Sequence, residues 1–151
     1  MEIIDLCGSK NILLAYEYDS PVEPQEFDVF GNKKMLPKCP EVSDELIRFN
    51  GWKDEGHETF MLHKKMPEPQ PFGQGKQYFE FCKTAHKPYD LAVGLILLSA
   101  SNHAPKTITV SSDGSWDVEW AEIRREYKKL FGLEPKCPSR RKLVEIILRD
   151  G

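Results

Sequence analysis

Four polar side chains between residues 82 and 113 are the strongest candidates for chemistry in this sequence. They are Cys82, His86, Asp90 and Asp113. A thiolate, an imidazole and a carboxylate all bind zinc, and a cysteine beside a histidine is a known nucleophile–base pair. The group supports one alternative function, a hydrolase or metal-dependent enzyme, in which His103 is a further candidate.

The expected secondary structure argues against this function. We place Cys82 on a strand and His86 in the turn before a helix, so their four-residue separation does not put them on one helix face. His103 would lie about 25 Å away along that helix, at about 1.5 Å per residue. A free cysteine usually packs as a small apolar side chain. The simpler interpretation is a core cysteine and a surface histidine, and we predict neither a metal nor a cofactor.

Small residues at Ser111–Gly114 form a second candidate, because a junction between a strand and a helix can offer backbone N–H groups to a phosphate. The glycine-rich motifs of nucleotide-binding loops are absent from the sequence. Asp113 and Gly114 suit a turn and Ser115 suits a helix cap. A structural role therefore accounts for these residues.

The first part of the chain combines aromatic and acidic side chains. The candidate partner-binding residues are Tyr16, Tyr18, Phe27, Asp28 and Phe30, and the other acids among them are Glu17, Asp19, Glu23 and Glu26. Aromatic anchors surrounded by charge are typical of recognition surfaces. Our leading hypothesis is a non-enzymatic protein that binds an unknown protein partner through residues 16–30. In the alternative interpretation, the rings are buried and the acids only solvate a loop.

A basic segment near the C-terminus suggests a third function, nucleic-acid binding. Its residues are Arg140, Arg141 and Lys142, with Lys128, Lys129 and Lys136 nearby in the sequence. Such a patch could contact phosphates. The net charge of −3 and the pI of about 5.8 argue against it, and no nucleic-acid-binding motif is recognisable. We therefore do not expect a nucleic-acid partner.

Residues 89–102 should form the central element that positions these candidates. Tyr89–Ala100 is interrupted by only three polar or small residues, so a helix here would be apolar around most of its circumference and buried. Pro105 prevents its continuation. The β-branched residues of Thr107–Ser111 then predict a strand.

A second, amphipathic helix should follow Ser115. Trp116, Trp120, Ile123 and Tyr127 recur at helical spacing and define an apolar face. The residues assigned to the opposite, charged face are Glu122, Arg124, Arg125, Glu126, Lys128 and Lys129. Gly132 lies where a helix C-terminus requires glycine.

The segments before residue 43 predict strands and a loop. Two apolar segments, Glu2–Cys7 and Asn11–Asp19, are separated by Gly8-Ser9, a pair that suits a tight turn. Together they indicate a β-hairpin. Residues 20–40 contain four prolines and should form a long loop with little regular structure. Its apolar residues should be tucked against the body; they are Phe27, Val29 and Phe30.

The remaining segments predict one helix and three strands. Ser43, acids in the first turn and Asn50-Gly51 at the end indicate a short helix. Residues 57–65 and 76–84 alternate as strands, the second with one buried face, and should pair with each other. Residues 139–150 fit either a helix or a strand, and the charges at their ends favour a strand.

Together these elements predict an α+β fold. We expect one domain spanning residues 1–151, with a mostly antiparallel sheet, a central apolar helix and a second amphipathic helix packed on one face. The apolar run Leu91–Leu98 is far shorter than the roughly 20 residues that cross a membrane, so we expect no membrane association. Four widely spaced cysteines and an acidic N-terminus indicate a reduced, cytoplasmic protein. A homodimer that pairs an exposed sheet edge is possible.

Overall fold

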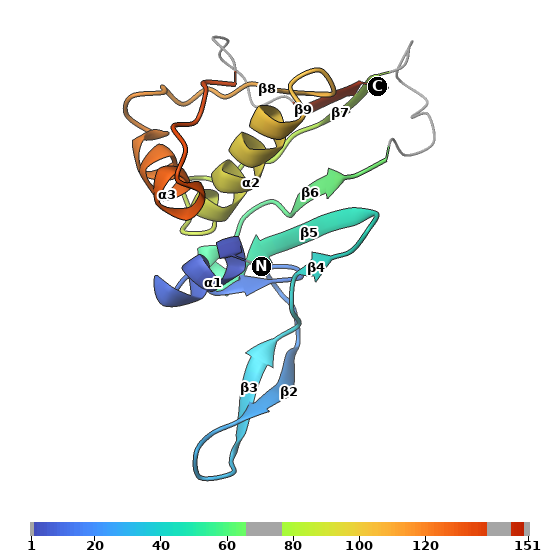
Figure 1. Cartoon of the computed structure of the whole chain (residues 1–151). Coiled ribbons are helices and arrows are strands. Elements are labelled where there is room, and N and C mark those ends of the chain that lie inside the picture. The colour runs from blue at the N-terminus through green and yellow to red at the C-terminus, as the bar shows by residue number, and fades with distance from the viewer. Residues whose placement is uncertain (1, 66–76, 139–145, 150–151) are drawn as a thin grey trace.

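The computed structural model describes residues 2–65, 77–138 and 146–149, and these form an α+β fold (Figure 1). In chain order the elements are α1 (Glu2–Ser9), β1 (Leu14–Ala15), β2 (Val22–Phe27), β3 (Lys33–Pro37), β4 (Glu41–Val42), β5 (Leu46–Gly51), the 3₁₀ turn η1 (Lys53–Glu55), β6 (Phe60–His63), β7 (Gln77–Glu80), α2 (Asp90–His103), β8 (Ile108–Val110), α3 (Ala121–Phe131) and β9 (Ile146–Arg149).

The strands are arranged in three groups, and every pairing among the described strands is antiparallel. β5 lies between β1 and β4 and also pairs with β6; β7, β9 and β8 form a second sheet; β2 and β3 form a separate hairpin. The predicted fold class is therefore confirmed, with the strands divided among three sheets.

The helix α2 is the buried centre of the molecule, as the sequence predicts. Tyr89, Leu95 and Leu98 are fully buried, and α2 contacts α1, β8 and α3. A Cβ on Gly94 would lie 2.3 Å from the Cδ1 atom of Ile123 in α3, so the two helices approach closely at this glycine. The strand predicted to follow is confirmed as β8.

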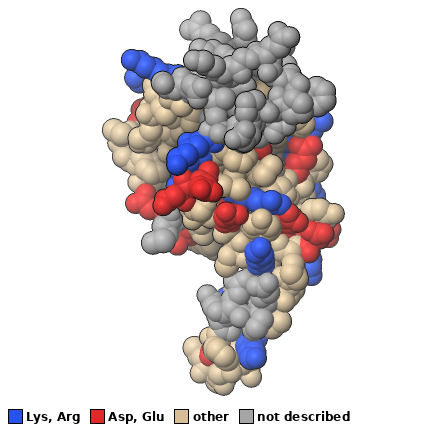
Figure 2. Space-filling view, turned by 90° about the vertical axis from the view of Figure 1, so that its right-hand side faces the viewer, with Lys and Arg blue, Asp and Glu red and all other residues tan. Residues whose placement is uncertain are grey.

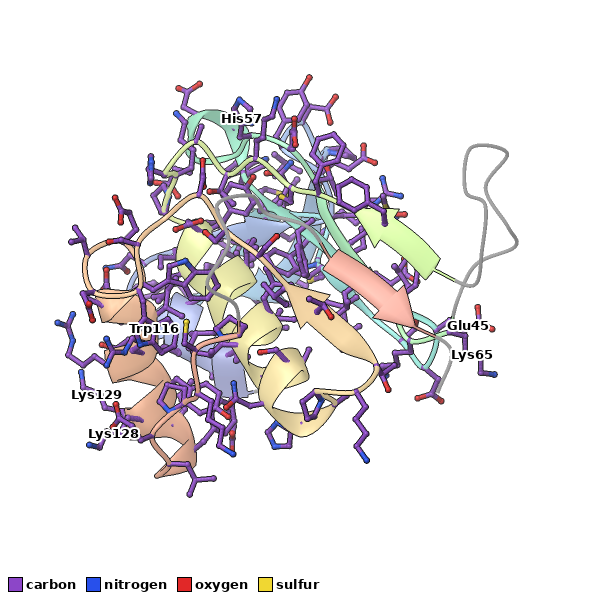
Figure 3. All side chains as sticks on the ribbon, turned by 90° about the horizontal axis from the view of Figure 1, so that it is seen from above. Glu45, His57, Lys65, Trp116, Lys128 and Lys129 are labelled. Atoms are coloured by element: carbon purple, nitrogen blue, oxygen red, sulfur yellow. The ribbon has the colours of Figure 1, made fainter. Side chains whose placement is uncertain are left out.

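The helix α3 is amphipathic, with Ile123 and Tyr127 buried against the core. Lys128 and Lys129 lie on its outer side (Figure 3). Its regular turns begin at Ala121 rather than directly after Ser115, and Gly132 ends the helix in the left-handed conformation at φ 68°.

The predicted strand at Glu2–Cys7 is wrong, because this segment forms α1. Ile3, Leu6 and Cys7 share one helix face and pack on the core. A helix of this length is marginal alone. Contact with α2 therefore decides its conformation.

The predicted helix that begins at Ser43 is also wrong, because the segment forms a turn followed by β5. The hydroxyl of Ser43 accepts hydrogen bonds from the backbone N–H groups of Glu45 and Leu46, at 3.3 and 3.1 Å, and closes the turn between β4 and β5. Serine satisfies turns and helix caps by the same kind of bond. Ile47 and Phe49 then contact the core at strand spacing.

Residues 20–40 are not a structureless loop, because β2 and β3 pair within them. The pairing register shifts between Pro24 and Glu26, and Pro37 is the last residue of β3. Proline is tolerated at bulges and in edge strands, so these prolines do not prevent a two-stranded hairpin.

Two further predictions about the strands were in error. β6 and β7 lie where strands were expected, but β6 pairs with β5 and β7 pairs with β9. Phe79 and Phe81, which were expected on the one buried face of this strand, are about half exposed, at 50% and 51%. The preference for a strand near the C-terminus agrees with β9; residues 139–145 lie outside the described residues.

Candidate functional site

The β2–β3 hairpin projects from the rest of the molecule (Figure 1). In the space-filling view it is a narrow extension whose end is mostly uncharged (Figure 2). Its two strands contact each other, and its ends meet where the N–H of Lys38 donates to the carbonyl of Pro21 at 3.3 Å. The hairpin is therefore a distinct element attached to the body at its base.

The tip of the hairpin, residues 27–32, is held by the carboxylate of Asp28. One oxygen accepts hydrogen bonds from the backbone N–H groups of Phe30 and Asn32, both at 2.8 Å, and the other accepts one from the Asn32 side-chain amide at 2.9 Å. These bonds, above all the one from the Asn32 amide, lower the pKa of Asp28. Gly31 adopts the positive φ of 81° that the turn needs. Asp28 thus fixes the tip rather than offering a free charge.

The predicted burial of the apolar residues in this segment is wrong. Phe27, Val29 and Phe30 are 70%, 93% and 87% exposed. Single exposed apolar residues are common in proteins. Three of them at the end of one projecting hairpin form an apolar patch, and such patches mark interaction sites.

The five predicted partner-binding residues do not form one surface. Tyr16 lies at the base of the hairpin, where Lys38 and Arg48 stack on its ring at 3.8 and 4.3 Å from the ring centroid. Tyr18 is also on the body and is half exposed. The length of β2, at about 3.3 Å per residue, separates them from Phe27 by about 17 Å. The tip residues Phe27, Asp28 and Phe30 therefore stand apart from the two tyrosines.

The four polar candidates Cys82, His86, Asp90 and Asp113 all line one pocket of about 640 Å³, which we call the α2–α3 pocket. It lies among the segment after β7, one face of α2, the turn after β8 and the first turn of α3. Its complete lining in the described chain is His57, Phe79, Phe81, Cys82, Lys83, Thr84, Ala85, His86, Asp90, Val93, Gly94, Leu97, Ser112, Asp113, Gly114, Glu119, Trp120 and Ile123.

Cys82 is a structural residue of this pocket. Its thiol donates to the carbonyl oxygen of Glu58 at 3.4 Å, and the hydroxyl of Tyr89 donates to the same oxygen at 2.7 Å. Burial raises the pKa of the Cys82 thiol to about 12. The nucleophile in cysteine chemistry is the thiolate. At neutral pH Cys82 remains protonated and is a poor nucleophile.

A strained turn places His86 at the pocket. Ala85 and His86 both have positive φ, at 51° and 55°, and the N–H of Lys87 donates to the carbonyl of Thr84 at 3.0 Å. This is the geometry of a type I′ turn, which glycine and asparagine favour. The Thr84 hydroxyl also donates to Asp90 at 2.6 Å, which ties the turn to the first residue of α2.

The turn after β8 supplies the opposite side of the pocket. The hydroxyl of Ser112 accepts hydrogen bonds from the N–H of Gly114 and the indole N–H of Trp120, both at 3.0 Å. The carboxylate of Glu119 accepts the N–H of Ser115 at 2.7 Å. A hydrogen bond with the Ser115 side chain is the main cause that lowers the pKa of Glu119; the backbone bonds and nearby His86 add to it.

His57, Glu119 and Trp120 are pocket residues that the sequence did not identify. His57 reaches the pocket because buried Asn50 holds its backbone: the Asn50 side chain accepts the N–H of His57 and donates to its carbonyl, both at 3.0 Å. His57 lies at the end of the sheet away from Glu45 and Lys65 (Figure 3). The Asn50-Gly51 pair suggested a helix end, whereas its role is to fix this loop.

The other predicted sites receive no support from the geometry. His103 is at the far end of α2, and its ring contacts the carbonyl of Ser99 at 2.7 Å. Within the described residues, no three His, Cys, Asp or Glu side chains are placed to hold a metal ion. Arg140, Arg141 and Lys142 lie outside the described residues.

Comparisons with known proteins do not assign a function. The chain matches no family model, no curated protein and no solved structure significantly. In the described part of the chain, no helix combines the length and apolar character needed to span a membrane.

Proposed function

We propose that this protein acts by binding another protein through the tip of the β2–β3 hairpin. The single observation that carries the proposal is that Val29 and Phe30, 93% and 87% exposed, are presented on a turn that Asp28 fixes by hydrogen bonds. Phe27 continues the same patch on the adjoining strand.

The energetics favour a recognition role for these side chains. Fully burying a valine or phenylalanine side chain is worth about 1.5–3 kcal/mol, so a partner that covers Val29 and Phe30 gains several kcal/mol. Ordering a flexible loop on binding would reduce this gain. Because the Asp28 carboxylate already orders the tip, less of the gain is lost. The partner that fits is a protein with an apolar pocket open to a narrow, projecting tip.

A photo-crosslinking residue at position 30 tests the proposal. We expect it to capture one protein from cell extract, and the purified partner to bind the wild-type chain directly. Val29→Ser should weaken this binding by about tenfold or more while leaving thermal unfolding unchanged, because Val29 is 93% exposed in the turn of a hairpin that projects from the body.

Val118→Ser is the matched control, since Val118 is 72% exposed and lies on the turn before α3. It should leave partner binding unchanged. Crosslinking that is equal at positions 30 and 118, or direct binding that survives Val29→Ser, would contradict the proposal.

The two alternative functions have less support. An enzyme that uses His86, Asp90 and Asp113 has a pocket, but in the described chain no Ser, Thr or Cys of that pocket is hydrogen-bonded to a histidine base. Nucleic-acid binding would depend on Arg140, Arg141 and Lys142 and remains a sequence prediction; steep salt dependence of binding would reveal it.

A further inference from the structure

We infer that the α2–α3 pocket binds a small organic cation with an apolar body. This inference is independent of the hairpin proposal, because none of the pocket residues belongs to the hairpin. It depends on three features of the pocket: its size and apolar floor, its excess of carboxylates, and its aromatic rings.

The size and floor suit a small molecule. Ligand pockets typically enclose about 300–1,000 Å³ and are lined mainly by apolar side chains with a few polar groups, and the α2–α3 pocket is about 640 Å³. Val93, Leu97 and Ile123 are buried apolar residues of its floor. An apolar ligand body would replace water on this floor.

The charges of the lining select a cation. Among the Asp, Glu, Lys and Arg side chains of the described lining there are three carboxylates, Asp90, Asp113 and Glu119, and one ammonium, Lys83. Across the part of the chain that the structure describes, none of these three carboxylates forms a salt bridge with Lys or Arg.

Local hydrogen bonds leave these carboxylates with capacity for a ligand. Thr84 occupies one oxygen of Asp90. Glu119 accepts hydrogen bonds from the N–H and the side chain of Ser115 and from its own backbone, and these are short-range bonds that add no positive charge. Asp113 is exposed and accepts no hydrogen bond from another described residue. Removing a carboxylate from water without giving it a hydrogen-bond donor or a positive charge costs a large free energy. A neutral or anionic ligand would therefore cover these groups at a cost that a cation avoids.

The aromatic rings favour the same ligand. Trp120 lines the pocket, as do Phe79 and Phe81, whose ring centroids are 6.1 Å apart. Cations bind over aromatic faces, most strongly over tryptophan. The strained turn at Ala85 and His86 and the Ser112 bond to the Trp120 indole fix the two sides of the pocket before a ligand arrives. An ammonium group on an aromatic or aliphatic body satisfies both the rings and the carboxylates.

Isothermal titration calorimetry with three probes of one shape tests the inference on the full chain. The probes are phenethylammonium, neutral 2-phenylethanol and anionic 3-phenylpropionate. We expect the cation to bind about tenfold more tightly than the neutral alcohol, and the anion to bind most weakly. Equal affinity for the three probes, preference for the anion, or no binding of the cation at about 10 mM would overturn the inference.

Variants locate the site. Asp113→Asn should weaken phenethylammonium binding about fivefold and leave 2-phenylethanol binding unchanged, and because Asp113 is exposed the fold should persist. Asp44→Asn is the matched control, since Asp44 is exposed and outside the pocket. Equal effects of the two variants would contradict the site. Val29→Ser should not change probe binding, so this test and the hairpin test fail or succeed separately.

Discussion

At the scale of single residues, Glu126 shows how a charge on a helix becomes part of the core. Its side chain is 3% exposed, and its carboxylate contacts the ammonium groups of Lys129 at 2.9 Å and Lys10 at 3.4 Å. The bond to Lys129 is the main cause that lowers the pKa of Glu126, and Lys10 adds to it. Since Lys10 follows α1, this carboxylate links the N-terminal helix to α3.

Glu126→Gln should lower the free energy of unfolding by about 1–2 kcal/mol at pH 7, because charged hydrogen bonds are lost. The pKa of Glu126 is depressed in the folded state, so its contribution is present above the ordinary carboxyl pKa and is lost as the pH falls through the folded value. Urea unfolding at pH 7 and near pH 3 should show the difference between the two proteins shrinking at low pH.

Glu122→Gln is the control, because Glu122 is half exposed and its 3.6 Å contact with Lys10 should contribute little. A Glu126→Gln effect that is the same at both pH values would contradict the role of this carboxylate. The sequence placed Glu126 on the charged face of its helix. The nearby partner Lys129 is compatible with an exposed helix face, so it does not indicate burial. The second partner, Lys10, is distant in the chain and can be found only in the folded structure.

At the scale of elements, the contact between α2 and α3 at Gly94 decides how closely the two main helices pack. Alanine is favoured over glycine inside a helix by about 1 kcal/mol. The added Cβ would lie 2.3 Å from Cδ1 and 2.9 Å from Cγ1 of Ile123, which is buried. Overpacking a core costs about 1–3 kcal/mol, so the clash exceeds the helix preference.

Gly94→Ala should therefore lower the free energy of unfolding by about 1 kcal/mol, measured by urea denaturation. Ile123→Val removes Cδ1, the atom closest to the new methyl group. In the Ile123→Val background, Gly94→Ala should cost less than in the wild type. A stabilising effect of Gly94→Ala in the wild type would show that the helices do not meet at this glycine.

Elements with strong periodicity were predictable, and elements decided by distant contacts were not. The apolar run of α2 and the helical spacing of α3 carry their conformation in their own residues. α1 is short and takes its conformation from α2, and the Ser43 signal fits a turn as well as a helix cap. The strand partners of β6 and β7 depend on segments elsewhere in the chain, which local patterns do not identify.

At the scale of the whole molecule, topology assembles the α2–α3 pocket from parts that look unrelated in the sequence. The polar candidates were identified by type, but their proximity required the end of β7, the start of α2 and the turn after β8 to meet at one place. The same topology separates the hairpin tip from Tyr16 and Tyr18. Proximity in the sequence therefore wrongly grouped Tyr16 and Tyr18 with the hairpin tip. It did not reveal that the polar candidates meet in the α2–α3 pocket.

This separation predicts that the hairpin can be removed without loss of the body. The N–H of Lys38 donates to the carbonyl of Pro21 at 3.3 Å, and the N–H of Tyr16 donates to the carbonyl of Lys38 at 2.8 Å, so the two ends already meet on the body. Replacing residues 22–37 by Asn-Gly would join these ends by a short turn. Isolated two-stranded hairpins are only marginally stable, so little stability is lost with this one.

The shortened chain should unfold with a free energy within about 2 kcal/mol of the wild type, because a shorter connection also reduces the entropy of loop closure. It should still bind phenethylammonium, and it should lose the protein captured at position 30. Thermal unfolding, calorimetry and crosslinking measure the three properties on the same sample. A shortened chain that fails to fold would contradict this prediction. It would show that the paired strands β2 and β3 stabilise the body, so that the hairpin has a structural role beside partner binding.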